Sequence, residues 1–178
     1  MNPITLAKHE FLLDGAAYFS DKLDLYMTIK HSISTELAVD VTEIRICGSA
    51  YWGRRFRDGS PFEPGVSDLD VAVISPLIYC RAMAETRDLT KNFSDQTSFP
   101  KASKRLSSFE EFQDYAFRKG IIRIDQLPNT LTRRLMMAAS ERISRDFLDH
   151  FEKITFSIYD STSSFAVKQA GAAKKFRE

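Results

Sequence analysis

Hydrophobic and polar positions follow two different periods along this chain, and each period predicts its own kind of element. In residues 20–38 polar side chains separate apolar ones at close to helical spacing, which predicts an amphipathic helix. Its apolar positions are Leu23, Tyr26, Met27, Ile33 and Leu37. Residues 41–47 alternate apolar with polar side chains instead, a pattern typical of a strand buried on one face. The same alternation returns in residues 67–74, so two strands are predicted in the first half of the chain.

Helical spacing dominates the second half. Ser108 and Glu111 have the spacing of a capping box, in which each side chain satisfies an exposed backbone amide, and Gly120 is the expected end of that short helix. A longer helix is predicted after residues 128–130. Its apolar positions are Leu131, Leu135, Ala138, Ala139, Ile143, Phe147, Leu148 and Phe151. A basic helix is predicted from about Ser163 onward.

Two more strands and two loops complete the pattern. Residues 154–159 alternate strictly, and residues 121–124 predict a brief strand. Residues 54–66 are rich in Arg, Gly and Pro without any period, which predicts a surface loop, and the polar residues 85–107 predict a flexible one. Strands mixed with helices, without internal repeats, predict one α/β (α+β) domain with a small mixed central sheet flanked by helices.

Composition limits the classes of partner. Lys and Arg number 25 against 24 Asp and Glu, so a site for a polyanion must be a local feature of the surface. Cys47 and Cys80 lack metal-ligand spacing and are interpreted as reduced, buried thiols. Residues 1–17 lack the apolar run of a secretory signal, and no stretch is long enough to cross a bilayer. We therefore expect a cytoplasmic protein with no membrane partner.

The most specific chemical signal lies between the two strands predicted in the first half. Gly48 and Ser49 follow the first strand, and Asp68 and Asp70 open the second. Because side chains two positions apart share one face of a strand, the two carboxylates lie side by side. They repel each other, and a divalent cation between them relieves that repulsion. Gly48 allows a phosphate to approach the backbone, and Ser49 offers it a hydroxyl and an amide.

These residues resemble the nucleotidyltransferase fold of the DNA polymerase beta superfamily. The family pattern is a Gly-Gly or Gly-Ser turn after a strand, a gap, and Asp-x-Asp or Asp-x-Glu between apolar residues, which Gly48-Ser49 and Ser67-Asp68-Leu69-Asp70-Val71 match. The match spans residues 46–74, under a fifth of the chain. It implies that Gly48, Ser49 and Ser67 hold a nucleoside triphosphate and that Asp68 and Asp70 bind Mg²⁺ or Mn²⁺.

The resemblance also implies a third acid on a later strand, and here this chain departs from the pattern. The strand at residues 154–159 has Thr155 and Ser157 on its polar face rather than a carboxylate. Asp125 is in phase with the polar side of residues 121–124 and is the first candidate, whereas Asp160 is in phase with apolar residues. The absence of a third acid is the remaining alternative. The 18-residue gap between Ser49 and Asp68 is also long for the family, which an inserted surface loop explains.

The resulting hypothesis is a nucleotidyltransferase that moves a nucleoside monophosphate from a triphosphate to an acceptor hydroxyl on RNA, protein or a nucleotide. By analogy, stand-alone domains of this kind belong to toxin-antitoxin or antiphage systems. The alternative is a catalytically degenerate domain of the same fold that binds a nucleotide or a partner protein as a regulatory subunit, which the missing acid favours. In a third interpretation Asp68 and Asp70 merely cap a turn.

Basic and aromatic residues outside this motif have ordinary interpretations as well. Arg54, Arg55 and Arg57 would suit phosphates or an acceptor, but an arginine-rich loop is more often simply solvated. The C-terminal helix would offer RNA a row of cations, yet its apolar positions fit an amphipathic helix with a wet basic face. Those cations are Lys168, Lys174, Lys175 and Arg177. Trp52 would flank a base, although an aromatic residue near a turn more often packs on the sheet.

Overall fold

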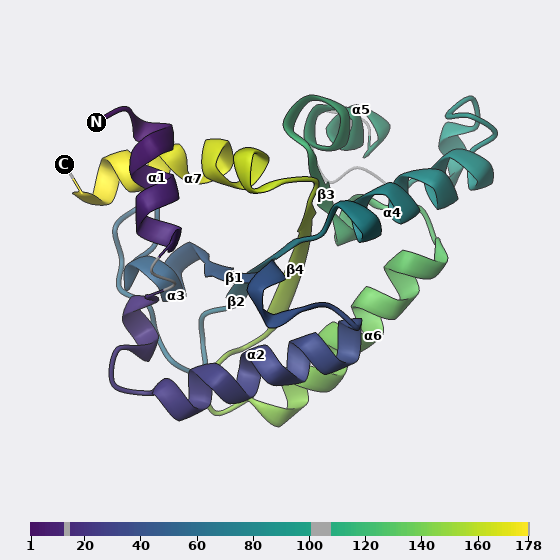
Figure 1. Cartoon of the computed structure of the whole chain (residues 1–178). Helices are drawn as coiled ribbons and strands as arrows, with labels where there is room; N and C mark the ends of the chain where they lie inside the picture. The colour runs from purple at the N-terminus through teal and green to yellow at the C-terminus, as the bar shows by residue number, and fades with distance from the viewer. Residues whose placement is uncertain (13–14, 101–107, 178) are drawn as a thin grey trace.

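A four-stranded mixed sheet forms the centre of the fold (Figure 1). The computed structural model describes residues 1–12, 15–100 and 108–177. The strands are β1 (Ile44–Cys47), β2 (Leu69–Ile74), β3 (Ile121–Arg123) and β4 (Ile154–Tyr159), in the spatial order β1-β2-β4-β3. β2 and β4 are parallel, and the two outer pairs are antiparallel. The predicted α/β class with a small mixed central sheet is therefore confirmed.

Alternation along each strand separates a wholly apolar face of the sheet from a mixed face that carries its polar side chains. The apolar face is built from side chains that are at most 5 % exposed: Ile44, Ile46, Leu69, Val71, Val73, Ile122, Ile154, Phe156 and Ile158. On the other face the register places Asp70 between Cys47 of β1 and Thr155 of β4, and Ser157 beside Arg123 of β3. The only acid within the four strands therefore lies on an inner strand, with a neighbour on each side.

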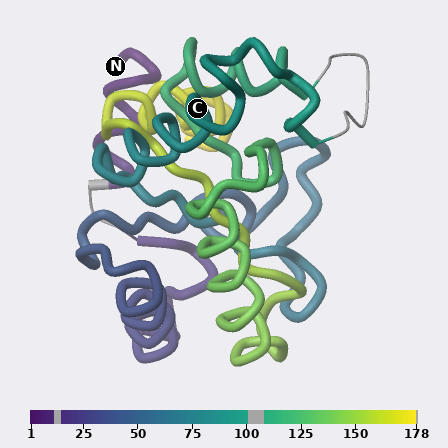
Figure 2. The backbone as a smooth tube through the Cα atoms, turned by 90° about the vertical axis from the view of Figure 1, so that its right-hand side faces the viewer, coloured from purple at the N-terminus to yellow at the C-terminus, as the bar shows by residue number. Residues whose placement is uncertain are grey.

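Helices cover both faces of this sheet. The helices are α1 (Pro3–Leu12), α2 (Leu23–Leu37), α3 (Gly48–Trp52), α4 (Pro76–Leu89), α5 (Ser108–Phe112), α6 (Leu131–Asp146) and α7 (Thr162–Arg177). Figures 1 and 2 show α2 and α6 side by side on one side of the sheet, while α1 packs along α7 on the other. α6 is tied to the sheet by two serines, because Ser140 Oγ donates to the Ile154 carbonyl and Ser144 Oγ accepts from the Ile154 amide at 2.9 Å.

The predicted helices at residues 20–38 and 131–151 form with shorter bounds, and parts of their apolar patterns are wrong as core positions. In α2 Tyr26, Ile29 and Ile33 are buried, whereas Leu23 and Met27 are 68 % and 58 % exposed. In and after α6 three predicted core leucines are more than half exposed, namely Leu131, Leu135 and Leu148. Each helix meets the sheet along one narrow stripe, so apolar side chains beside that stripe remain at the surface.

Short or weakly patterned helices were not predictable in this way. α1, α3 and α4 have no counterpart among the predicted elements, and α4 continues through residues 85–89, which were expected to be irregular. Thr86 is fully buried there, and its hydroxyl donates to the Ala82 carbonyl. The rest of the expected loop lies partly outside the described residues, at 101–107. Cys80 on α4 is exposed, which corrects the prediction of two buried thiols; both cysteines are free.

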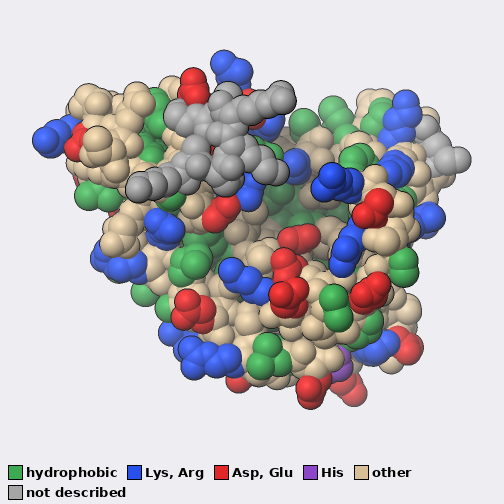
Figure 3. Space-filling model, turned by 180° about the vertical axis from the view of Figure 1, so that it is seen from behind, with side chains coloured by type: hydrophobic (Ala, Val, Ile, Leu, Met, Phe, Trp, Pro, Cys, Tyr) green, Lys and Arg blue, Asp and Glu red, His purple; other side chains and the backbone are tan. Residues whose placement is uncertain are grey.

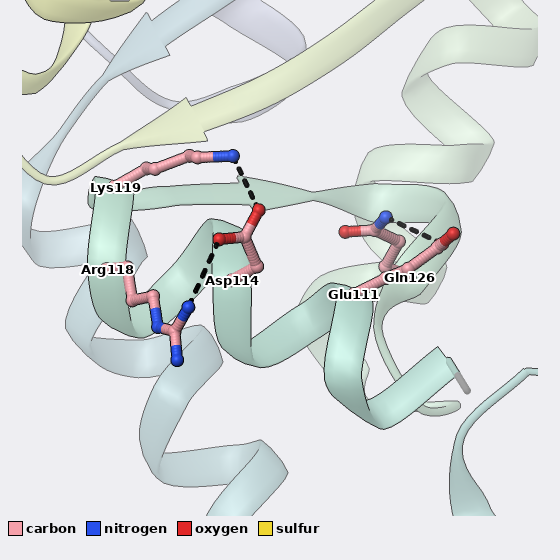
Figure 4. Close-up of polar contacts among 5 residues, drawn as sticks. All are labelled: Glu111, Asp114, Arg118, Lys119 and Gln126. Atoms are coloured by element: carbon pink, nitrogen blue, oxygen red, sulfur yellow. Dashed lines mark hydrogen bonds and ion pairs between the residues drawn. The ribbon is translucent and has the colours of Figure 1, made fainter. Parts of the chain in front are cut away.

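The two side chains of the predicted capping box at the start of α5 have other partners, so this prediction is wrong. Ser108 Oγ donates to the carbonyl of Pro100, and Glu111 accepts a hydrogen bond from Gln126 Nε2 at 3.2 Å (Figure 4). The helix does end near Gly120, whose φ of +66° is the left-handed conformation expected at a helix end. Glu111 is thus used to attach this helix to the turn after β3.

No helix in the part of the chain described here is both long and apolar enough to cross a bilayer. The sheet and its helices instead enclose a core rich in aromatic rings. Phe151 is fully buried at its centre, with ring centroids 5.5, 6.0 and 6.1 Å from those of Tyr18, Phe19 and Phe62. Phe151 therefore joins the N-terminal segment, the loop before β2 and the segment that leads into β4.

Phe151→Ala is expected to lower the free energy of unfolding by about 3–5 kcal/mol, because it removes a buried ring and leaves a cavity. Urea unfolding followed by circular dichroism measures the change. The matched control is Leu148→Ala, three residues earlier, whose side chain is 56 % exposed; that change is expected to cost about 0.5 kcal/mol or less. Equal losses for the two variants would contradict this assignment of the core.

Candidate functional site

Asp68 and Asp70 stand at the start of β2, where the chain leaves the loop of residues 54–66. Asp70 is a half-buried residue of the strand, and Asp68 is an exposed residue directly before the strand begins. Burial raises the pKa of Asp70, and the negative charge of nearby Asp68 adds to that rise. The period of the strand alone predicts that the two acids are neighbours.

Gly48 lies in contact with the carboxylate of Asp70. Its φ is +66°, and a Cβ at this position would lie 2.1 Å from Asp70 Oδ2 and 2.9 Å from Cγ. Any side chain here would therefore meet both backbone strain and a collision with the acid. Gly48 and Ser49 open α3 directly after β1, and both line the same cavity as Asp70. The glycine turn and the acidic strand are thus brought together as predicted.

Thr155 occupies the place on β4 that faces Asp70. The two residues are register partners on parallel strands, and Thr155 Oγ1 donates a hydrogen bond of 2.9 Å to Asp70 Oδ1. A third acid on this strand would stand here, but the chain has a hydroxyl. Asp70 therefore has one oxygen bound by Thr155 and the other packed against Gly48. Its orientation is fixed from both sides.

Neither candidate for the third acid completes a three-carboxylate site. Asp125 lies on the turn after β3, is exposed, and accepts a 2.8 Å hydrogen bond from Arg123. Asp160 follows the opposite end of β4, roughly 16 Å along the strand from Thr155, and accepts a hydrogen bond from Ser161. In the described ranges no three acidic, histidine or cysteine side chains converge on one metal position. Asp125 does line the same cavity as the acid pair.

Burial governs the electrostatics of the two acids. It raises the pKa of Asp70 above that of an ordinary carboxyl, while the hydrogen bond from Thr155 works in the opposite direction. Burial, followed by the charge of Glu152, also raises the pKa of Asp68. Lys153 and Arg55 pull the pKa of Asp68 back down. Both ionised carboxylates would therefore gain from a nearby divalent cation.

A cavity of about 920 Å³ opens beside the acids. Figure 3 shows a hollow on the face seen from behind, with acidic and basic side chains gathered around it. The cationic residues of its lining are Arg55, Arg57, Arg123, Lys153 and Lys168. Among the described residues, Arg123 has a carboxylate partner within 4.0 Å and the other four have none. Four cations that face the hollow are thus available to an anion.

Ser67, which was also expected to hold the nucleotide, lies at the edge of the cavity. It is buried, and its Oγ accepts hydrogen bonds from the Glu63 amide at 3.1 Å and from Arg55 Nη2 at 3.4 Å. The Ser67 amide donates to the Glu63 carbonyl. Ser67 borders the cavity, but its polar groups close the loop before β2. The contact with Arg55 holds that loop beside the acids.

The far wall of the cavity carries Tyr115, which sequence reasoning did not single out. Tyr115 lies on a π-helical turn (Gln113–Phe117) that continues α5. Cationic groups of Lys119, Arg123 and Lys168 lie 4.4, 5.6 and 5.4 Å from its ring centroid. Asp114 braces the turn through contacts with Arg118 and Lys119 (Figure 4). The π-helical geometry of this turn leaves no signal in the hydrophobic periodicity of the sequence, so Tyr115 could not be found from the pattern.

Neither the scan against protein-family models nor the searches of curated proteins and of solved structures finds a match to this chain. The site is therefore interpreted from its own geometry: two neighbouring acids of which Asp70 is held in one orientation, a glycine turn in contact with that acid, and a cavity with unpaired cations.

Asp70→Asn is expected to raise the melting temperature at pH 7 by about 2–4 °C when no divalent cation is present. The pKa of Asp70 is raised in the folded state, so its ionisation destabilises the fold above the ordinary carboxyl pKa near 3.8. The difference should vanish below that pH, where the carboxyl is protonated in both states. Excess Mg²⁺ should stabilise the wild type but not the variant. Thermal unfolding across pH measures this, and a wild type more stable than Asp70→Asn in EDTA at pH 7 would contradict it.

Proposed function

We propose that this chain binds a nucleoside triphosphate with Mg²⁺ or Mn²⁺ in the cavity and transfers its nucleoside monophosphate to an acceptor hydroxyl. The proposal includes a nucleotidyltransferase-like arrangement of the sheet. One observation carries it: Asp70 is packed against Gly48 beside Asp68, at a cavity with four unpaired cations. A turn that merely needed capping would not require a glycine in contact with a half-buried acid.

The residues at the acid pair fit magnesium. Mg²⁺ is held in such enzymes by one or two carboxylates together with phosphate oxygens and water, and Asp68 and Asp70 supply two carboxylates whose ionised forms are disfavoured by burial. When bound there, the ion neutralises negative charge on the phosphates as pyrophosphate departs. A site made of two carboxylates also leaves room for the phosphates among the remaining ligands.

The chain's own residues hold the substrate in this proposal. Gly48 lets the turn after β1 lie directly against Asp70, and Ser49 on the same turn offers a phosphate its hydroxyl. Lys168 and Arg55 attract the triphosphate from two sides of the cavity. Thr155 keeps the Asp70 carboxylate in one orientation through its 2.9 Å hydrogen bond. The acceptor oxygen bonds to the α-phosphorus, the bond from that phosphorus to the bridging oxygen of the β-phosphate breaks, pyrophosphate leaves, and the hydroxyl proton passes to water.

The wild-type chain, incubated with magnesium, labelled triphosphates and total RNA, is expected to release pyrophosphate or transfer label. Asp70→Ala should lower this activity by at least about 100-fold, since it removes a carboxylate that acts in the transition state. The matched control is Asp24→Asn on α2, an exposed acid outside the cavity lining, which should leave the activity unchanged. Activity that survives in Asp70→Ala would contradict the proposal.

A second candidate function is nucleotide binding without turnover, as a regulatory subunit. The observation that favours it is Thr155, which stands where a third acid would face Asp70. If the wild type binds a triphosphate with Mg²⁺ but transfers nothing, Thr155→Asp is expected to create measurable transfer, because it restores a carboxylate at that register position. Thr155→Val is the matched control and should not. If the wild type transferred label and Thr155→Asp reduced that transfer, the regulatory function would be contradicted.

A further inference from the structure

Basic residues are concentrated in two segments that lie far apart in the sequence. Residues 53–57 and 161–177 hold seven of the 25 Lys and Arg residues and no acidic residue. The rest of the chain holds 18 basic against 24 acidic residues, so it is net negative. The chain as a whole is nearly neutral, which makes this separation of charge a local feature of the kind that attracts a polyanion.

The fold joins these two segments into one surface. Figure 1 shows the loop after α3 beside the C-terminal end of α7. The Lys175 ammonium donates to the carbonyl of Phe56 and lies 4.8 Å from the Phe56 ring centroid. The Arg54 guanidinium lies 4.9 Å from the ring of Phe176, and the two phenylalanine rings are 6.2 Å apart and perpendicular. We call the surface formed by Arg54, Phe56, Arg57, Lys175 and Phe176 the aromatic-basic strip.

Aromatic rings alternate with cations in this strip, and Phe56 is its accessible ring, whereas Phe176 is half-buried. Phe56 is 55 % exposed, and Arg54, Arg57 and Lys175 are exposed as well. Arg54, Arg57 and Lys175 have no carboxylate partner within 4.0 Å among the described residues, so their charge is not neutralised within the fold. An exposed ring beside cations that lack a carboxylate partner suits single-stranded nucleic acid, because bases stack on rings while phosphates meet cations.

The strip leads into the cavity. Phe56 and Arg57 belong both to the strip and to the cavity lining, and α7 continues from the strip to Lys168 on the cavity wall. A strand that lay on the strip would therefore present a nucleotide to the side of the cavity where Gly48 and Asp70 meet. The loop at residues 54–66, which lengthens the gap between Ser49 and Asp68, would thus help to place a nucleic-acid strand rather than only lie in solvent.

We propose that the aromatic-basic strip binds a single-stranded polynucleotide and guides one of its hydroxyls to Asp68 and Asp70 as the acceptor. The guidance step rests on the proposed transferase function, but binding to the strip does not. An acidic protein or another polyanion would use the cations without the rings. The phenylalanine therefore distinguishes a polynucleotide from those partners.

Fluorescence anisotropy of the full chain with labelled single strands of about 20 nucleotides, RNA and DNA of one sequence, tests the binding. Phe56→Leu is expected to weaken binding about tenfold, because leucine keeps apolar contact but cannot stack. Phe117→Leu is the matched control, since Phe117 is 52 % exposed away from the strip, and it should change nothing. Melting temperatures of both variants, equal to that of the wild type, show that the fold is retained.

The charge contribution is measured by salt dependence. Arg57→Gln combined with Lys175→Gln should reduce the slope of log K against log salt by about 1.4, or 0.7 for each lost phosphate contact. Arg87→Gln, an exposed arginine on α4, should leave the slope unchanged. The proposal would be overturned if neither the RNA nor the DNA strand bound, or if Phe56→Leu and Phe117→Leu had equal effects. It would also be overturned if polyglutamate bound as tightly as the oligonucleotides and Phe56→Leu weakened both kinds of binding equally.

Failure of this inference is distinguishable from failure of the transferase function. Oligonucleotide binding is measured without triphosphate or magnesium, and Asp70→Ala should leave it intact. Binding that depends on Phe56 supports the strip even when no label is transferred. If Phe56→Leu and the paired Arg57 and Lys175 variant both transferred label to total RNA as the wild type does, the guidance role would be overturned. The proposed catalytic site would not be affected by that result.

Discussion

The contact between Asp70 and Gly48 is the constraint around which the site is organised. The carboxylate of Asp70 occupies the space that any side chain at position 48 would fill, and its other oxygen is held by Thr155. This arrangement needs β1, β2 and β4 side by side in their observed register, because Gly48 directly follows β1, Asp70 lies on β2 and Thr155 lies on β4. Packing of α6 on the start of β4 in turn fixes Thr155 relative to Asp70.

The energetic cost of this arrangement points to a ligand. A half-buried carboxylate whose pKa is raised by burial, next to a second acid, destabilises the folded chain near neutral pH. The surrounding cavity offers both ways of relieving that cost, through a cation at the acids and through an anion at the four unpaired basic side chains. A metal-bound polyphosphate would satisfy both groups at once. The aromatic-basic strip adds a separate surface, whose rings and cations suit a longer anion.

The sequence predicted the parts of this structure that depend on local period. Strict alternation located β2 and β4 and put Asp68 and Asp70 side by side, and Gly48 was expected to lie near them. The local period could not predict that Thr155 would be the partner of Asp70. These two residues are 85 positions apart, and the register between their strands depends on tertiary packing. Tyr115 was missed because a π-helical turn has no hydrophobic signature. The exposed Leu23 and Leu131 show that helical spacing alone does not tell which apolar residues reach the core.

The central claim is that the Gly48 turn and the acid pair form one site for a metal-bound nucleotide. Calorimetric titration of a non-hydrolysable triphosphate analogue into the wild type and Gly48→Ala, with Mg²⁺ or with EDTA, tests it most directly, because this substitution changes no charge. We expect magnesium-dependent binding by the wild type and its loss in Gly48→Ala, provided that circular dichroism shows the variant folded. Binding of equal strength to both chains, or binding indifferent to magnesium, would contradict it.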